Sequence, residues 1–290
     1  MSKQLAIQGL PGSYTEIAAY KLAPKINSTD ILYCKTFREV FDAVKSGAAQ
    51  RGVVAFANTR LGFITEPFSI LTGHETMHDF WVDGGTTIPV NHCLAALPGA
   101  TLKGIKHIVT QPEAFRQCGD FVGSLNGGVQ FIEGKDTALS AKEVSESGKR
   151  DIAAICSEAA AKLYNLHILK QSIQDDRLNL TRFVSFTKAA NALPTGPEAD
   201  NSIAIMTISQ APGSLVKGLR AFEAANVNLK TIQSRYIPNT PLEIDIVIEF
   251  ECGIKDPRMK QVKHDLAYAD ISLTIIGSYK AAKKGNNPNV

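Results

Sequence analysis

Short apolar runs alternate with helical patterns along the first 190 residues of the chain. The runs have the length of buried strands, and they lie at residues 4–8, 31–34, 52–56, 87–97, 105–109, 129–132 and 151–156. Most are followed by a turn and an amphipathic helix with recognisable ends, such as the helix that Thr36 caps and Gly47 stops. Repeated strand–turn–helix units predict an α/β fold with a mostly parallel sheet and helices on both faces.

The pattern changes after residues 189–200, where two prolines and a glycine are typical of a linker. Beyond it come strand, helix, strand, strand, helix and strand patterns, at residues 202–209, 213–225, 229–237, 244–250, 257–267 and 273–276. This order is that of the ferredoxin-like split βαβ arrangement. We therefore expect two domains, at residues 1–190 and 200–282.

Four polar turns lie at the ends of predicted strands, at Gly12-Ser13, Asn58-Thr59, Thr110-Gln111 and Asn179 to Arg182. Ligands of open α/β sheets bind at such strand ends, so we expect the turns to form one crevice. The first turn opens a helix, where backbone N–H groups favour an anion. It lacks the Gly-Lys-Ser/Thr ending of a Walker A loop and the third glycine of a dinucleotide fingerprint, so a carboxylate is the expected ligand.

The last turn belongs to a polar stretch, residues 174–183, between two apolar runs. Thr181 offers a hydroxyl that exchanges a proton, Arg182 a rigid fork for a carboxylate, and Asn179 a donor and an acceptor. These groups suit an anionic small molecule that carries a hydroxyl. A solvated loop that caps a strand would explain the same residues, so the stretch alone leaves both interpretations open.

Composition excludes several classes of protein. The chain has 290 residues, 44% of them apolar and 20% charged, a net charge of +3 and no block of like charges, so nucleic acid is not expected as a partner. Its first residues do not resemble a secretion signal, and it contains no apolar run of membrane-spanning length. Its five cysteines form no Cys-x-x-Cys pair, which argues against disulfides and zinc. We expect a cytoplasmic protein with reduced thiols.

The order and spacing of two motifs make the chain similar to the prephenate dehydratase family over nearly its whole length. Gly9-Leu10-Pro11-Gly12-Ser13-Tyr14-Thr15 resembles the family's Gly-Pro-x-Gly-Ser-Tyr-Ser/Thr turn, and the family's Asn-x-Thr-Arg-Phe is intact at Asn179 to Phe183. Partial matches lie at residues 57–62, 110–118, 137–141 and 154–160. The C-terminal segment resembles the regulatory ACT domain through Gly213-Ser214-Leu215-Val216 and Gln233-Ser234-Arg235-Tyr236.

The resemblance implies a two-lobed, periplasmic-binding-protein-like catalytic domain followed by a ferredoxin-like ACT domain. It implies a lyase that converts prephenate into phenylpyruvate, with loss of water and carbon dioxide, in phenylalanine biosynthesis. No metal or organic cofactor is implied, because formation of the aromatic ring drives the reaction.

The resemblance also assigns roles to residues. Thr181 is the candidate general acid for the departing hydroxyl, and Arg182 the partner of a carboxylate. Asn58 and Gln117 are expected to hold the ring hydroxyl or a carboxylate. Further substrate contacts are expected from Gly12, Ser13, Tyr14, Thr59, Thr110, Asn179 and Phe183.

The ACT-like segment implies control by L-phenylalanine, which in the family binds at a subunit interface. The expected effector residues are Gly213, Ser214, Leu215, Val216, Gln233, Ser234 and Arg235. Exposed sheet edges of such domains commonly pair, so we expect a homodimer or homotetramer.

Departures from the family pattern keep two alternatives open. Ala57 stands where the family has Glu, which would remove a carboxylate from the crevice, and Glu113 or Glu158 would be its replacement. Thr110-Gln111 stand where the family has Ser-His. One alternative is an enzyme that decarboxylates prephenate without losing the hydroxyl, although the retained Thr181 argues against it. The other is a non-catalytic ligand-binding or regulatory protein.

The histidines give weaker signals. His92 lies in an apolar run beside Cys93, so we expect a packed core side chain rather than a catalytic one. His74 and His78 have the i, i+4 spacing of a helical metal site, but no third ligand lies nearby in the sequence.

Overall fold

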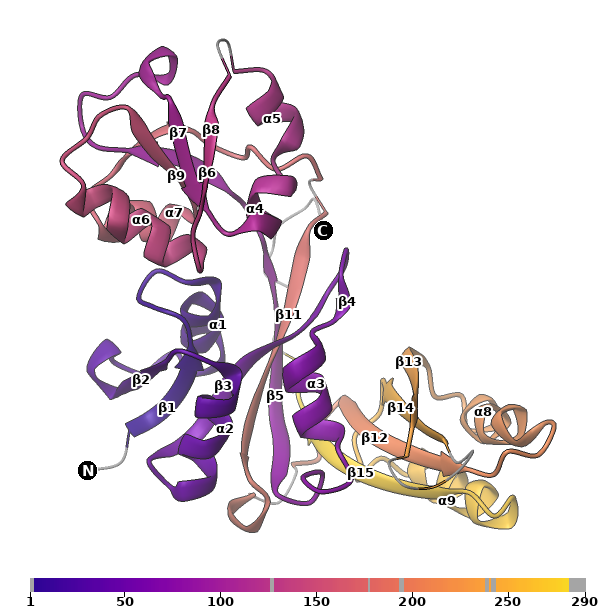
Figure 1. Cartoon of the computed structure of the whole chain (residues 1–290). Coiled ribbons are helices and arrows are strands. Elements are labelled where there is room, and N and C mark those ends of the chain that lie inside the picture. Colours follow the sequence, from indigo (N-terminus) through magenta and orange to yellow (C-terminus); the bar gives the residue numbers. More distant parts are fainter. Residues whose placement is uncertain are drawn as a thin grey trace.

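The computed structural model describes residues 3–125, 128–176, 178–192, 196–237, 240 and 244–281. Residue 177 of the polar stretch, residues 193–195 of the predicted linker and residue 282 lie outside this described part. Figure 1 shows two lobes, one above the other, and a C-terminal unit beside the lower lobe. Within the described residues, no helix is long and apolar enough to span a membrane.

The lower lobe is built on a sheet with the strand order β5-β11-β3-β1-β2. Helix α1 packs on one face and helices α2 and α3 on the other, so that Val53 of β3 lies with α1 and its neighbour Val54 lies with α2. Thr36 caps α2 and Gly47 ends it with a φ of 83°, as predicted. The elements are β1 (Lys3–Gln8), α1 (Tyr14–Leu22), β2 (Ile31–Cys34), α2 (Phe37–Ser46), β3 (Ala49–Asn58), β4 (Gly62–Phe63), α3 (Thr65–Thr72), β5 (Phe80–Pro89) and β11 (Leu180–Lys188).

The upper lobe has its own sheet, with the strand order β10-β6-β9-β7-β8. Alanine-rich α6 packs closely on one side of it, with Ala138 and Ala141 against Ala154. Its elements are β6 (Cys93–Ala96), β7 (His107–Thr110), α4 (Pro112–Arg116), α5 (Gly119–Gly123), β8 (Gln130–Glu133), α6 (Thr137–Glu146), β9 (Ile152–Cys156), α7 (Glu158–Leu163) and β10 (His167–Lys170).

Two chain segments connect the lobes. The prediction of a single strand at residues 87–97, in the outgoing segment, is wrong. This run is two strands, β5 in the lower sheet and β6 in the upper one, with a break between Pro89 and Cys93. At the break, Val90 N donates to Asn179 O and Ile173 N donates to His92 O, so the outgoing and returning segments lie side by side. A continuous apolar run cannot reveal that its two halves enter different sheets.

The prediction of a mostly parallel sheet is also wrong in part. β11 returns from the upper lobe and pairs antiparallel with both β3 and β5, whereas β1 pairs parallel with β2 and β3. In the upper sheet, β7 pairs parallel with β8 and β9, but β6 pairs antiparallel with β9 and β10. The returning direction of β11 depends on tertiary topology, which strand–turn–helix patterns do not encode.

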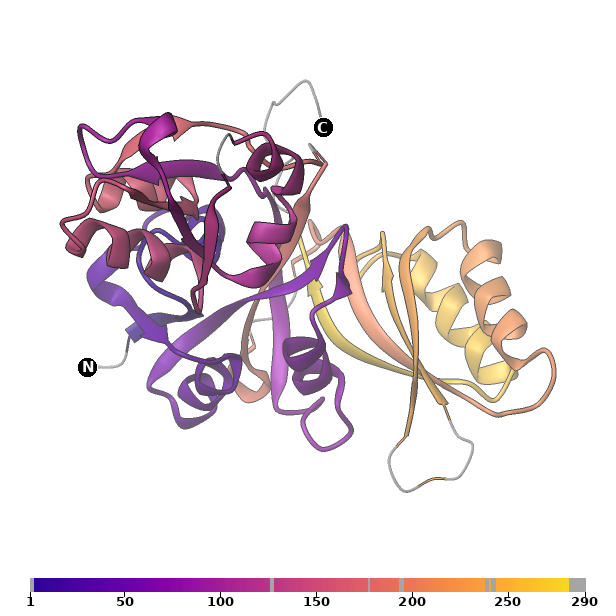
Figure 2. The same cartoon turned by 45° about the horizontal axis from the view of Figure 1, so that its top comes forward.

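The C-terminal unit has the predicted split βαβ order, with antiparallel strands in the order β13-β14-β12-β15. Its helices cover one face of the sheet, and the other face meets the lower lobe (Figure 2). Gly277 of β15 lies so close to Val82 of β5 that an added Cβ would stand 2.5 Å from Val82 Cβ. The elements are β12 (Asn201–Ile208), α8 (Ser214–Ala224), β13 (Leu229–Tyr236), β14 (Ile244–Phe250), α9 (Arg258–Tyr268) and β15 (Ser272–Tyr279).

The predicted two-lobed architecture with a ferredoxin-like C-terminal unit is confirmed. The division at residues 190 and 200 stays a prediction, because a single core cluster contains Val54 and Phe186 of the lower lobe together with Ile203 and Ile205 of the C-terminal unit.

Candidate active site

A pocket of about 200 Å³ lies where the two lobes meet. Its size is below the ~300 Å³ at which pockets for drug-sized ligands begin, so it suits a small metabolite. Residues from all four predicted turns contribute to its wall. The lining residues are Gln8, Gly9, Ser13, Tyr14, Thr15, Ala55, Asn58, Leu61, Ile64, Val90, His92, Gln111, Glu113, Gln117, Asp136, Thr137, Asn179, Thr181 and Phe183.

Asn58 and Thr181 are cross-strand partners in β3 and β11, so their side chains point to the same face. Asn58 Nδ2 donates to Thr181 Oγ1 at 2.9 Å and to Asn179 Oδ1 at 2.8 Å. Asn58 Oδ1 accepts from the backbone N–H groups of Arg60 and Leu61, which fixes the orientation of the amide. The Thr181 hydroxyl thus accepts from Asn58, and its own proton is available to a ligand in the pocket.

Gln117 extends these hydrogen bonds into the upper lobe. Its Oε1 accepts from Asn179 Nδ2 at 2.9 Å and lies 3.1 Å from His92 Nε2, while its Nε2 donates to Glu113 at 3.1 Å. Burial lowers the pKa of His92 below its ordinary value, so the ring is neutral and donates through Nε2. A continuous chain of side-chain amides therefore joins Glu113 to Thr181.

Glu113 brings a carboxylate to the pocket from the first turn of α4. Its Oε2 accepts from Arg116 Nη2 at 2.7 Å, and its Oε1 accepts from Gln117. The hydrogen bond from Arg116 lowers the pKa of Glu113, so the carboxylate is ionised at neutral pH. Glu158, the other predicted carboxylate, does not line the pocket; it forms a surface ion pair with Lys162 on α7.

Arg182 does not point into the pocket, which contradicts its predicted role there. Adjacent residues of a strand point to opposite faces, so Arg182 projects away from the side that Thr181 occupies. Its guanidinium contacts the Glu249 carboxylate and the Tyr279 hydroxyl of the C-terminal unit and lies over the Phe56 ring. Ala57 is its cross-strand partner, so residue 57 does not line the crevice either, and the predicted loss of a crevice carboxylate there is wrong.

The Gly12-Ser13 turn is a lobe contact rather than an open anion site. Gly12 N donates to Glu16 Oε2 at 2.6 Å and Ser13 N donates to Leu10 O at 3.1 Å, so the two predicted N–H groups are occupied. Gly12 itself packs against Ala160 of the upper lobe. Ser13 and Tyr14 line the pocket, and their contact with a substrate stays a prediction.

Two predicted threonine contacts lie outside the pocket wall. Thr110 is fully buried, and its hydroxyl donates to Ile155 O at 2.9 Å, so the neighbouring Gln111 lines the pocket instead. Thr59 is exposed, and its hydroxyl donates to Leu178 O and accepts from Leu180 N. Thr59 therefore holds the start of β11.

Asp136, Thr137 and His92 are among the pocket residues that sequence reasoning missed. Asp136 and Thr137 start α6 after β8 and lie at a strand end like the predicted turns, so the same rule would have found them. His92 was expected in the core. It is 2% exposed yet lines the pocket, and its position inside an apolar run gave no sign of that.

The predicted effector residues lie around two hollows of about 280 Å³ each that share Gln210 and Ile244 in their walls. One is lined by residues 208–216, including all four residues of the Gly213–Val216 motif, and the other by Ser234 and Arg235. Gln233, by contrast, is exposed and does not line them.

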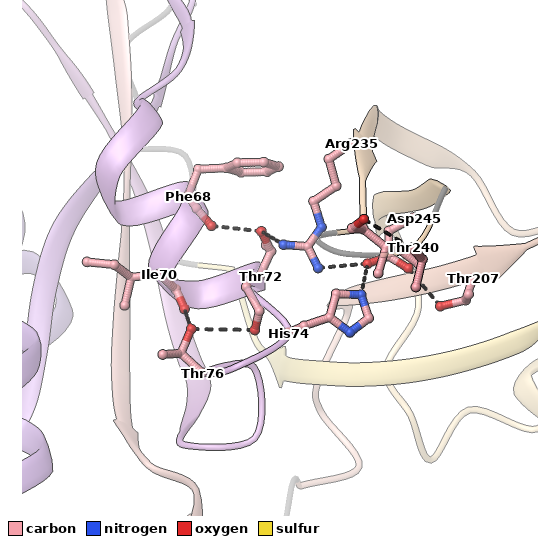
Figure 3. A network of polar contacts seen from close by, with 11 residues as sticks. Phe68, Ile70, Thr72, His74, Thr76, Thr207, Arg235, Thr240 and Asp245 are labelled. Carbon is pink, nitrogen blue, oxygen red and sulfur yellow. Dashed lines mark hydrogen bonds and ion pairs between the residues drawn. The ribbon is translucent and has the colours of Figure 1, made fainter. Parts of the chain in front are cut away.

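The Arg235 guanidinium is already paired inside the molecule. It forms an ion pair of 2.7 Å with fully buried Asp245 and contacts Thr72 of the lower lobe at 3.3 Å (Figure 3). His74 Nε2 lies 2.7 Å from Asp245, so this histidine belongs to the contact between the units. Among the residues described, no three His, Cys, Asp or Glu side chains are grouped as they would be to hold a metal ion.

Comparisons with known proteins agree with the motifs. Residues 5–191 match the family model described as prephenate dehydratase. Arogenate dehydratase/prephenate dehydratase 1 of Arabidopsis thaliana is 33% identical over 291 residues, which cover 95% of this chain and 71% of the relative.

Two solved structures share the fold over nearly the whole chain. GqqA, described as a novel type of quorum quenching acylase, has a TM-score of 0.83 at 26% identity, covering 97% of this chain and 99% of that one. The prephenate dehydratase of Arthrobacter aurescens in complex with L-Phe has a TM-score of 0.81 at 24% identity, covering 97% and 91%. The family match over residues 5–191, and the similarity to the plant enzyme over 95% of this chain, show that the chain belongs to the prephenate dehydratase family.

Proposed function

We propose that the chain catalyses the decarboxylative dehydration of prephenate, or of its 2-amino counterpart arogenate, in aromatic amino acid biosynthesis. The observation that carries the proposal is the Thr181 hydroxyl. It accepts a hydrogen bond from Asn58, and its own proton is available inside the pocket at the interface of the lobes. The name of the Arabidopsis thaliana relative, which combines the two substrates, supports the same reaction class.

In the proposed reaction, the bond between the ring and its carboxylate breaks and carbon dioxide leaves. The freed electron pair enters the ring and expels the hydroxyl group on the opposite carbon, which gives the aromatic product. The departing oxygen takes the proton of Thr181 and leaves as water, and Thr181 regains a proton from solvent. Donation from Asn58 into Thr181 Oγ1 makes that hydroxyl a better acid, and general acid help of this kind is typically worth ~10²–10⁴ in rate.

The substrate carboxylates need partners other than Arg182. Helix α6 begins at the pocket, where Thr137 lines its wall. Partial positive charge at helix N-termini stabilises anions. We expect one substrate carboxylate near this helix start, with the substrate ring beside Phe183.

The acyl chemistry named for GqqA finds less support in this pocket. Acyl transfer to a side chain requires a nucleophile hydrogen-bonded to a base. His92 Nε2 is bonded to Gln117, and Thr181 accepts from Asn58. Among the described lining residues, one hydroxyl lies near a His nitrogen: the Tyr14 hydroxyl is 3.4 Å from His92 Nδ1. We find no other lining hydroxyl or thiol that is hydrogen-bonded to a histidine.

Turnover of prephenate and arogenate by the purified chain, followed by formation of the aromatic product, tests the proposal. Thr181→Val should lower kcat by about 10²–10⁴ with little change in fold, and Thr181→Ser should retain most activity. Thr187→Val is the matched control, because Thr187 lies on the same strand and donates to Gln50 O outside the pocket.

Other outcomes identify the alternatives. Substrate loss without an aromatic product indicates a decarboxylase that keeps the hydroxyl. Binding without turnover indicates a non-catalytic protein. Equal activity of wild type and Thr181→Val would show that Thr181 is not the general acid.

We further propose that L-phenylalanine acts through the C-terminal unit. The two hollows beside the Gly213–Val216 motif and Ser234 support this, because they offer backbone and hydroxyl groups for an amino acid. L-phenylalanine should raise the melting temperature and lower activity, and Gly213→Val should weaken both effects. Unchanged melting and activity in excess L-phenylalanine would contradict the proposal. The expected dimer or tetramer is tested by light scattering in the same samples.

A further inference from the structure

The charged side chains in the wall of the active-site pocket are all acidic. Among its described lining residues, the ionisable acids are Glu113 and Asp136, and no Lys or Arg is present. Arg182, which would have balanced them, is held by Glu249 on the other face of β11. The pocket therefore offers carboxylate acceptors to a cationic group on its ligand.

Glu113 is the acid best placed to receive such a group. Glu113 lines the pocket, and among the described residues its Oε1 accepts one hydrogen bond, from Gln117 at 3.1 Å. A carboxylate oxygen has room for a second donor. The Arg116 side chain is 69% exposed, and its guanidinium pairs with the other oxygen of Glu113, Oε2. Arg116 therefore balances the Glu113 charge from the solvent side, and it does not line the pocket.

Asp136 is less available than Glu113. Its Oδ1 accepts from Leu139 N at 2.7 Å as the N-cap of α6, so part of its charge is balanced by the helix. The amide chain from Glu113 through Gln117 and Asn179 to Thr181 also ties the position of Glu113 to the reacting end of the pocket.

We infer that Glu113 selects the substrate by its ammonium group, so that this chain prefers arogenate, the amino acid, to prephenate, the keto acid. The inference rests on the proposed dehydratase function and deepens it. The two compounds share the ring, the hydroxyl and both carboxylates, and they differ only in the side chain, where an ammonium replaces a ketone. An ammonium donates a charge-assisted hydrogen bond to the Glu113 carboxylate, whereas a ketone oxygen has no proton to donate and meets a like partial charge.

The test compares kcat/KM for arogenate and prephenate in wild type and in Glu113→Gln. The variant keeps the length of the side chain and its acceptor for Gln117, but removes the negative charge. We expect wild type to favour arogenate by at least tenfold, and Glu113→Gln to lower that ratio by about 10- to 100-fold, the effect of one charge-assisted hydrogen bond. The loss should appear mainly in KM for arogenate, because the ammonium keeps this contact in the ground and transition states.

Glu158→Gln is the matched control. Glu158 also pairs with a basic residue one turn away on its helix, at 2.6 Å, but lies outside the pocket, so its removal should leave the ratio unchanged. A wild-type preference for prephenate, or the same ratio in wild type and Glu113→Gln, overturns the inference.

Failure of the dehydratase proposal is a separate outcome. If wild type turns over neither compound, calorimetric titration of wild type and Glu113→Gln with both compounds tests the charge selection alone. If wild type binds arogenate more tightly than prephenate, and Glu113→Gln does not, the result supports selection of the ammonium group by Glu113. Equal binding of the two compounds overturns it.

Discussion

Asn58 has one orientation because both ends of its amide are occupied. The oxygen accepts two backbone N–H groups of the following turn, and the nitrogen donates to Thr181 and Asn179. This arrangement uses one lone pair of the Thr181 oxygen and leaves the hydroxyl proton for a ligand. The two residues therefore act as a unit.

We predict that Asn58→Ala lowers kcat by about tenfold or more, because Thr181 loses the donor that polarises and orients it. In a double-mutant cycle, Asn58→Ala should add little to Thr181→Val, since both remove the same function. Asn228→Ala, on the exposed surface of the C-terminal unit, serves as the control. Fully additive effects of Asn58→Ala and Thr181→Val on kcat would contradict the pairing.

His92 predicts a pH dependence of stability. Burial lowers its pKa below the ordinary value of 6.5, so the unfolded chain takes up a proton at a pH where the native chain does not. Its contribution to the free energy of unfolding is fully present above about pH 6.5, and it decreases as the pH falls through the lowered native value.

Urea unfolding between pH 5 and 8 measures this contribution. His92→Gln should flatten the loss of stability on the acid side, whereas His78→Gln, at an exposed position, should leave it as in wild type. If His92→Gln and wild type lose stability in parallel, the neutral buried state of His92 is wrong.

Residue types at strand ends predicted much of the pocket. Asn58, Gln117, Asn179 and Thr181 meet there because the ends of their elements meet. The prediction that Arg182 lies beside Thr181 in the pocket is wrong because both residues are on β11, where neighbouring side chains point to opposite faces.

At the level of elements, the contact between the Gly9–Thr15 turn and helix α7 holds the lobes together. Ser157 Oγ donates to Gly12 O at 2.7 Å, and Tyr164 donates to Pro11 O at 3.1 Å. Gly12 has a φ of 88°, and an added Cβ would stand 2.7 Å from Ala160 Cα. The glycine is required both by its backbone conformation and by the approach of α7.

We predict that Gly12→Ala destabilises the chain more than Gly47→Ala does. Gly47 has a similar φ of 83° but nothing within 4 Å of the added Cβ, so it measures the backbone cost alone, about 1–2 kcal/mol. Gly12→Ala should cost a further ~1–3 kcal/mol from overpacking against Ala160, and should lower activity. If thermal or urea unfolding shows that Gly12→Ala and Gly47→Ala lose the same free energy of unfolding, the lobes adjust to the extra methyl group.

Helix ends were predictable because caps are local. Thr36 caps α2 and Gly47 ends it, as the sequence predicts. The division of residues 87–97 between two sheets was not predictable, because it depends on the returning strand β11, distant in the sequence.

At the scale of the whole molecule, one face of β14 joins the C-terminal unit to the lower lobe. Asp245 and Glu249 point to the same side of the strand as Val247, which is part of the shared core. Asp245 pairs with Arg235 and His74 (Figure 3), and Glu249 with Arg182. The second pair reaches the residue next to Thr181, so a shift of β14 acts directly on the strand that carries the candidate acid.

The pair of Arg182 and Glu249 gives the last prediction. Their side chains are 17% and 2% exposed, and removal of one partner leaves a buried charge, which typically costs ~3–5 kcal/mol. Glu249→Ala should therefore destabilise the chain by about that amount and also lower kcat, because β11 loses its anchor beside Thr181. The exposed pair of Lys45 and Asp79 is the control, and Asp79→Ala should cost under ~1 kcal/mol.

The double variant Arg182→Met/Glu249→Leu separates charge from packing. It removes both charges and fills the space with apolar side chains, so it should recover most of the stability lost in Glu249→Ala. If the pair also transmits the effect of L-phenylalanine, the double variant should be active but insensitive to that amino acid. Retained sensitivity in a stable double variant would assign transmission to Asp245 and Arg235 instead, which form another ion pair between β14 and a neighbouring strand.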